Sequence, residues 1–118
     1  MSQRLDNYLR SYRRRAGLSQ EEMAFLLGGK DGAKVCRHER FARTPTIETA
    51  FAYEIVFGVV TSELFAGIYD QVERKTLRRV KTLLARVESS QGGRLRERKL
   101  ALLREALNAR KLPSDGTP

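Results

Sequence analysis

The side chains best placed to do chemistry lie on a short basic segment, residues 30–44, between two consecutive glycines and a proline. Lys34 and Arg37 are three residues apart, which makes them neighbours on one face of a helix. The planar guanidinium of an arginine can bind two acceptors of a guanine edge at once. The pattern favours contact with nucleic-acid bases. Arg37 is the first candidate, and the small residues Gly32 and Ala33 would allow a close approach.

Polar residues around the same segment could hold a nucleic-acid backbone. Phosphate oxygens accept hydrogen bonds from basic side chains, from hydroxyls and from the backbone amides at the start of a helix. The candidates for phosphate contacts are Gln20, Lys30, Arg40, Arg43 and Thr44. Together with the candidates for base contact, they predict a surface for double-stranded DNA.

Catalysis and metal binding are the rival chemistries for this segment, because it also holds Cys36 and His38. Residues two apart on a helix point in different directions, so this pair cannot readily act as nucleophile and base or chelate one ion. They are the only cysteine and the only histidine of the chain, which excludes an internal disulfide, a cysteine zinc site and a Ser-His-Asp set elsewhere. We expect a packed His38, no metal, no cofactor and no enzyme activity.

The elements that position these side chains are predicted to be helices. Ser19 and Glu22 have the spacing of a capping box, in front of a helix over residues 20–27. The double glycine then releases the chain for a turn into a second helix, residues 32–40, which Asp31 can cap. Two short helices joined by a glycine turn, the second one basic, match a helix-turn-helix, whose second helix enters the DNA major groove.

Three further helices are expected around this motif, and no strand pattern is present. Apolar residues at three- and four-residue spacing predict a helix over residues 3–15. Thr46 is expected to cap a fourth helix and Ser62 a fifth. The buried stripe expected on the fourth helix is Ile47, Phe51, Ile55 and Val56. The prediction is an all-α domain of five helices over residues 1–69.

A family resemblance rests on three stretches of the chain: AGLSQEEMAFLLG, RHERFARTPTIETA and GVVTSELFAG. With them, about residues 4–68 resemble the phage-repressor and Cro family of helix-turn-helix regulators, also called the xenobiotic-response-element type. The resemblance implies that Gln20 contacts phosphate and that Arg13 and Glu39 form a structural ion pair. The positions that it implies for base contact are Gly32, Ala33, Lys34 and Arg37.

The chain departs from that family at three points. Its turn around residues 28–30 holds one extra residue, so the second helix of the motif can start differently. His38 stands where the family usually has Ile or Leu. Phe41 stands where the family commonly has glycine or asparagine with a positive φ. That conformation is costly for a bulky side chain, so we expect another path out of the helix.

The charge of the chain favours a polyanionic partner. It carries 23 Lys and Arg against 14 Asp and Glu, a net charge of +9, with a pI near 10.3. Residues 1–43 contribute +5, residues 44–69 contribute −3 and residues 70–118 contribute +7. The start of the chain has charges where a signal peptide is apolar, and no apolar run reaches the roughly 20 residues that span a bilayer. We therefore expect a cytoplasmic protein with no membrane contact.

The C-terminal third is expected to form a basic amphipathic helical hairpin over residues 70–112, followed by a flexible tail over residues 113–118. Turn residues at 89–93 separate a helix that ends near Glu88 from one that starts at Arg94. The apolar stripe expected to mediate homodimerisation or partner binding is Val80, Leu84, Val87, Leu100, Leu103 and Leu107. A membrane-surface helix is disfavoured because both apolar stripes lack Trp and Phe.

The sequence thus predicts a sequence-specific DNA-binding transcriptional regulator. A homodimer would place two copies of the basic helix in successive major grooves about 34 Å apart, on an inverted repeat. The family resemblance implies repression. Two alternatives stay open. One is an interaction protein, similar to antitoxins that resemble this family, which binds a protein partner through the hairpin. The other is an RNA-binding protein that uses the arginine-rich C-terminal helices.

Overall fold

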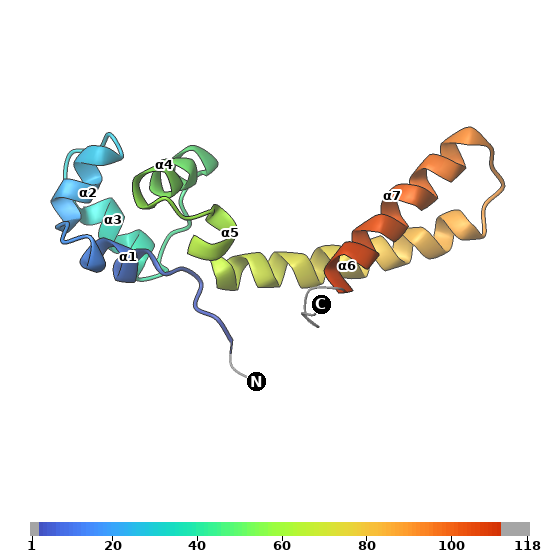
Figure 1. Cartoon of the computed structure of the whole chain (residues 1–118), viewed down its shortest axis with the longest axis horizontal. Coiled ribbons are helices and arrows are strands. Elements are labelled where there is room, and N and C mark those ends of the chain that lie inside the picture. The colour runs from blue at the N-terminus through green and yellow to red at the C-terminus, as the bar shows by residue number, and fades with distance from the viewer. Residues whose placement is uncertain (1–2, 112–118) are drawn as a thin grey trace. The chain divides into compact units, whose positions relative to one another are not determined.

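The computed structural model of the chain describes residues 3–111, which form seven helices and no strand (Figure 1). The helices are α1 (Leu9–Arg15), α2 (Gln20–Leu26), α3 (Ala33–Glu39), α4 (Ile47–Phe57), α5 (Thr61–Leu64), α6 (Ala66–Glu88) and α7 (Arg94–Lys111). The predicted all-α class is confirmed. The described residues divide into two compact units between Asp70 and Gln71, against a predicted boundary after residue 69. The predicted tail over residues 113–118 lies outside the described part of the chain.

The first unit has one apolar core, to which each helix from α1 to α5 contributes. The buried members of this core are Leu9, Met23, Ala24, Val35, Tyr53, Leu64 and Phe65. The ring of Tyr53 stacks on Phe57 and meets Phe65 edge-on, with centroids 6.1 and 6.4 Å apart. Helices as short as α1, α2 and α3 are not stable alone in water, so the shared core is what holds them in place.

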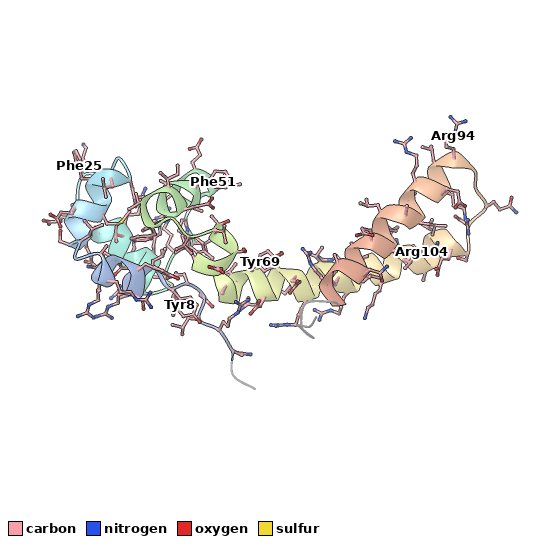
Figure 2. The ribbon with its side chains drawn as sticks, in the orientation of Figure 1. Tyr8, Phe25, Phe51, Tyr69, Arg94 and Arg104 are labelled. Atoms are coloured by element: carbon pink, nitrogen blue, oxygen red, sulfur yellow. The ribbon has the colours of Figure 1, made fainter. Side chains whose placement is uncertain are left out.

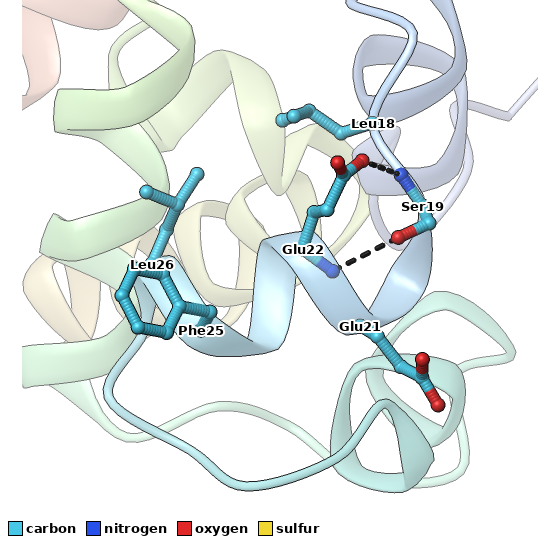
Figure 3. Close-up of a pocket in the computed structure, with 6 residues that line it drawn as sticks. All are labelled: Leu18, Ser19, Glu21, Glu22, Phe25 and Leu26. Atoms are coloured by element: carbon cyan, nitrogen blue, oxygen red, sulfur yellow. Dashed lines mark hydrogen bonds between the residues drawn. The ribbon is translucent and has the colours of Figure 1, made fainter.

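A serine side chain caps α2, whereas α3 begins at a glycine. Ser19 accepts a hydrogen bond from the N–H of Glu22, and the Glu22 carboxylate accepts one from the N–H of Ser19 (Figure 3). The predicted capping box is therefore confirmed. Asp31, the predicted cap of α3, accepts from the N–H of Ala33 at 2.9 Å, but it lies one residue before the N-cap position. The α3 helix starts one residue later than predicted, because Gly32 is its non-helical cap.

The ends of α1, α2 and α3 share one geometry. The residue after each helix cap has a positive φ: Gly17 at 77°, Gly28 at 85° and Phe41 at 66°. The following residue then donates its N–H to a carbonyl five residues back, as Ala42 does to Arg37 at 2.9 Å. This is the Schellman motif, which satisfies the last carbonyls of a helix and usually employs glycine. The expected alternative path at Phe41 is wrong, because the chain keeps the positive φ with a phenylalanine.

The first helix is much shorter than predicted. Residues 3–8 are not helical, and α1 begins only at Leu9, whose N–H donates to the side-chain oxygen of Asn7 at 3.0 Å. The Tyr8 N–H donates to the carbonyl of Leu64 at 2.8 Å. A helix through this segment would direct the same N–H along its own axis. The tertiary hydrogen bond therefore wins over the apolar periodicity that predicted a longer helix.

The buried side of α4 is also not the predicted one. Ile47, Phe51 and Ile55 are 69%, 50% and 79% exposed, whereas Tyr53 is fully buried. Of these four side chains, Phe51 is labelled in Figure 2, on the outside of α4. Of the predicted stripe, only Val56 packs against the core. The helix is apolar on nearly every side, so periodicity could not indicate which side faces the core.

The predicted cap of α4 is confirmed, and the predicted cap of α5 is wrong. Thr46 caps α4 as expected, accepting from the N–H of Thr49 at 3.2 Å. The α5 helix starts at Thr61, so the predicted cap at Ser62 is wrong. A carboxylate from the preceding helix replaces a local cap here, since Glu54 accepts from the N–H of Thr61 at 3.1 Å.

The first turn of α6 belongs to the first unit. Ala66 and Gly67 are buried, and the N–H of Gly67 donates to the carbonyl of Leu5 at 2.7 Å. Asp70, the last residue of this unit, accepts from the guanidinium of Arg4 at 2.9 Å. A side chain at position 67 would collide with the backbone of residues 4 and 5, so this close approach requires glycine.

The second unit consists of the rest of α6, the turn over residues 89–93 and α7. The seam between the two helices is formed by Val80, Leu84, Val87, Leu100 and Leu103. Arg96 closes the turn by donating to the carbonyls of Glu88 and Ser90, each at 3.0 Å. The hairpin therefore has its own small apolar core and its own loop-closing contacts.

Candidate nucleic-acid interface

The outward face of α3 carries three of the side chains predicted to contact bases. Ala33, Lys34 and Arg37 are exposed, and so is Arg40 directly after the helix. The buried residues of α3 are Val35, His38 and Glu39. One side of this helix is thus free for a ligand while the other side is enclosed by the first unit.

Gly32, the fourth residue predicted to face bases, has a packing role. It is partly buried, and a Cβ at this position would lie 2.9 Å from the Cβ of Gln20 and 3.2 Å from its carbonyl carbon. Any side chain would push the starts of α2 and α3 apart. The prediction for Gly32 is therefore corrected. The absence of a side chain lets α2 and α3 touch, and this packing role comes in addition to the close approach to DNA that was predicted.

An ion pair underneath α3 fixes it to α1. Arg13 donates from Nε to Glu39 Oε2 at 2.6 Å and from Nη2 to Oε1 at 3.1 Å. The structure therefore contains the ion pair that the family resemblance implies. The side chains are only 12% and 2% exposed, and the hydrogen bond from Arg13 to Glu39 raises the pKa of the guanidinium. A charged side chain that is largely removed from water is costly unless it is paired, so each of these two groups depends on the other.

Gln20 joins the same network from α2. Its side-chain Nε2 donates to Glu39 Oε1 at 3.1 Å. One amide hydrogen and the carbonyl oxygen of Gln20 are not used by this bond. The predicted phosphate contact would therefore use the second amide hydrogen, on a side chain that Glu39 already orients.

His38 is a packed histidine, as expected. It is 2% exposed, and its Nδ1 lies 3.0 Å from the hydroxyl of Tyr53 on α4. Its backbone carbonyl accepts from the side-chain amide of Asn7 at 2.9 Å. Burial lowers the pKa of His38, and nearby positive charges, Lys34 first among them, lower it further. The ring is therefore neutral at pH 7 and ties α3 to α4.

Two members of this network, Asn7 and Tyr53, were missed in the sequence. Asn7 is buried and uses both ends of its amide, donating to His38 and accepting from Leu9. An asparagine ahead of an apolar run is a typical helix cap, which was the available signal. Tyr53 is fully buried, and burial raises its pKa. No sequence signal marked it, because its helix is apolar all round.

The remaining candidates for phosphate contact lie on the surface at the two ends of α3. The exposed ones are Lys30, Arg40, Arg43 and Thr44. A shallow cleft opens between the starts of α2 and α3, and its lining includes Gln20, Ala33, Cys36 and two acids, Glu21 and Asp31. These cations therefore lie before and after α3 in the chain, while the lining of the cleft holds one acid on α2 and one just before α3.

The apolar stripe predicted for dimerisation or partner binding lies inside the hairpin. Val87, Leu100 and Leu103 are buried in the seam, with Val80 and Leu84 packed against them, and Leu107 is partly buried. These side chains contact one another within one chain. The apolar residues of the hairpin that face outward are Val72, Leu83, Leu95 and Leu102.

Two other kinds of site are absent from residues 3–111. No group of three His, Cys, Asp or Glu side chains there is close enough to hold a metal ion, and no helix is long and apolar enough to cross a membrane. Comparison with protein-family models, with curated proteins and with solved structures found no match. A function for this chain must therefore be inferred from its own residues.

Proposed function

We propose that this chain is a sequence-specific DNA-binding transcriptional regulator whose α3 helix enters the major groove. The observation that supports this most is how α3 is held. Ala33, Lys34 and Arg37 project outward from a helix whose buried side is hydrogen-bonded to α1, α2 and α4. Base contact requires side chains placed to a fraction of an ångström on a rigid element. A short helix tied to three others meets that requirement.

The proposed roles follow from exposure and chemistry. Arg37 selects a base through two hydrogen bonds to a guanine edge. Lys34 contacts a base or a neighbouring phosphate, and the small Ala33 and Gly32 allow the helix to approach. The residues proposed to hold the DNA backbone are Gln20, Lys30, Arg40, Arg43 and Thr44.

A homodimer is the proposed binding form. Two copies of α3 in successive major grooves would be about 34 Å apart, which requires an inverted repeat with half-sites about one helical turn apart. Doubling the base contacts raises the preference for the operator over other DNA. Repression by blocking a promoter is the mode that the family resemblance implies.

Selection of duplexes from a random library tests this proposal, because it finds a preferred sequence without a chosen operator. The full chain is expected to enrich an inverted repeat with a guanine in each half-site. Library members bound without any enriched sequence would contradict the proposal, since a basic protein binds all DNA to some extent.

The residue assignment is tested with Arg37→Ala on the enriched duplex and a scrambled one, by fluorescence anisotropy. The preference for the enriched duplex is expected to fall by about 1 to 3 kcal/mol. Arg94→Ala is the matched control, because Arg94 is an exposed arginine at the start of α7 in the other unit (Figure 2). An equal loss of preference in both variants would contradict a base contact by Arg37.

A further inference from the structure

The outer face of α6 carries a group of positive charges with no acid among them. Residues 74–86 contain six exposed cations and no acid; the cations are Arg74, Lys75, Arg78, Arg79, Lys81 and Arg86. With a rotation of about 100° per residue, they fall within an arc of roughly 160° of the helix surface. The other residues of α6 after Asp70 that share this arc are Gln71, Thr82 and Ala85, so the arc holds no carboxylate.

The acids of α6 are paired away from this face. Each has an arginine partner, and the pairs are Asp70 with Arg4, Glu73 with Arg110, and Glu88 with Arg104. None of the six cations has a carboxylate partner within residues 3–111. The positive charge of the face is therefore not compensated by the part of the chain that the structure describes.

Repulsion within the face works against the helix. Arg74 and Arg78 are four residues apart, and so are Lys75 and Arg79, and like charges at this spacing destabilise a helix. A helix face that only meets solvent ordinarily mixes both signs of charge. A polyanion bound along the face would turn the repulsion into attraction, which is the simplest reason for such a pattern.

We infer that this face of α6 binds the backbone phosphates of duplex DNA regardless of sequence. Arginine and lysine side chains supply most of the sequence-independent affinity of proteins for DNA. Residues 71–111 contain no Phe, Tyr or Trp, so the stacking platform that single strands need is missing. Binding to a membrane surface needs a continuous apolar face to insert, and the apolar seam of α6, formed by Val80, Leu84 and Val87, is packed against α7.

The inference rests on the proposed function in its choice of duplex DNA as the partner. It does not depend on Arg37, because contacts to the backbone carry no sequence information. The face would add affinity for any duplex, whereas α3 would add the difference between one duplex and another.

Two matched triple variants of the full chain test the inference. One carries Arg74→Gln, Arg78→Gln and Lys81→Gln on the α6 face. The other carries Arg94→Gln, Arg98→Gln and Lys99→Gln on α7, which removes the same three charges from exposed positions. None of these side chains makes a hydrogen bond within residues 3–111, so circular dichroism should show unchanged helicity in both variants.

The measured quantity is the slope of the logarithm of the binding constant against the logarithm of salt concentration, on a scrambled duplex. The slope is negative, and each lost phosphate contact lowers its magnitude by about 0.9. The magnitude should therefore fall by up to about 2.7 in the α6 variant and hardly at all in the α7 variant. Equal losses in both variants would overturn the inference in favour of a general effect of net charge. An unchanged slope in the α6 variant would overturn it as well, as would tighter binding of single-stranded RNA than of duplex DNA.

The same titrations keep this inference separate from the proposed function. The α6 variant should weaken binding to the enriched and scrambled duplexes by the same factor and leave their ratio unchanged. Arg37→Ala should reduce the ratio. A chain that shows no sequence preference but loses its salt slope in the α6 variant would refute the proposed function and support the inference. A chain that keeps its preference for the enriched duplex, and whose salt slope does not change in the α6 variant, would support the proposed function and refute the inference.

Discussion

The first unit buries an ion pair and a polar contact beside its core, whereas the hairpin has its ion pairs at the surface. In residues 3–70 the Arg13–Glu39 pair and the contact between His38 and Tyr53 are buried beside the apolar core. In residues 71–111 the buried seam is apolar, and the Arg104–Glu88 pair is half exposed.

This difference matches what each surface is proposed to do. A buried polar group is satisfied in only one arrangement, so it specifies where a helix lies as well as stabilising it. The α3 helix must present Arg37 at a defined position to reach a base edge. A cationic face that meets phosphates has no such demand, since phosphates recur along the whole duplex.

The largest effect is expected from breaking the buried ion pair. Glu39→Gln leaves Arg13 buried without an anion and should lower the free energy of unfolding by about 3 kcal/mol. Glu88→Gln breaks an exposed pair in the hairpin and should cost less than about 0.5 kcal/mol. Urea denaturation followed by circular dichroism measures both. Similar small losses in the two variants would show that the buried pair does not hold the first unit together.

Truncating the seam should affect the hairpin alone. Leu100→Ala removes a buried side chain and should cost about 2 kcal/mol, a large share of the stability of two helices with so small a core. Hydrogen exchange should then accelerate along α7 and the later turns of α6, while α1 to α5 keep their protection. Leu95→Ala, at an exposed position of α7, is the control. A loss of protection in both units together would contradict their independence.

Stability should fall as the pH is lowered through about 6.5, the ordinary pKa of histidine. Burial lowers the pKa of His38 in the folded state, so the unfolded chain takes up the proton first. The contribution of the neutral His38 to the free energy of unfolding is complete above about pH 6.5. It is lost as the pH falls from about 6.5 to the pKa of His38 in the folded protein. One proton contributes at most about 1.4 kcal/mol per pH unit.

Urea midpoints at pH 7.5 and pH 5.5 measure this dependence. The double variant His38→Leu and Tyr53→Phe removes both partners of the contact and should lose most of the dependence between these two pH values. An unchanged dependence in the double variant would assign the effect to other groups.

The smallest effect is expected at the exit from α3. Phe41 has a φ of 66°, which costs a bulky residue about 1 kcal/mol, and its side chain is half exposed. Phe41→Asn should therefore raise the melting temperature. Gly28→Ala, at the equivalent position after α2, should lower it, because glycine suits the positive φ there. A lower melting temperature in Phe41→Asn would mean that the ring contributes more by packing than it costs in strain.

Local signals in the sequence predicted the parts of the fold that depend on near neighbours. The capping box at Ser19 and Glu22 links residues three apart, and the turn at residues 89–93 is set by its own glycines and serines. The Arg13–Glu39 pair joins distant residues, and only the family resemblance placed it. The three-residue spacing of Lys34 and Arg37 placed them on one face of the predicted helix, and both are exposed in α3.

The predictions that proved wrong concern features of the fold that are determined by contacts with distant parts of the chain. The start of α1 depends on Leu64, which accepts the hydrogen bond from Tyr8, and no local pattern contains that information. The buried side of α4 depends on neighbouring helices, because Phe51 and Tyr53 are equally apolar candidates for the core. At Phe41 the hydrogen bonds at the end of α3 prevail over the residue's own preference.

The first turn of α6 limits where recombination between genes could replace the hairpin of such a protein. Gly67 and Asp70 complete the first unit through Leu5 and Arg4, although they lie on the helix that continues into the hairpin. A gene fusion joined between α5 and α6, at Phe65, would separate the first unit from residues that complete it. The junction that preserves both units falls inside a helix, after Asp70. A replacement for the hairpin would therefore have to begin as a helix, which narrows the range of sequences that recombination could attach.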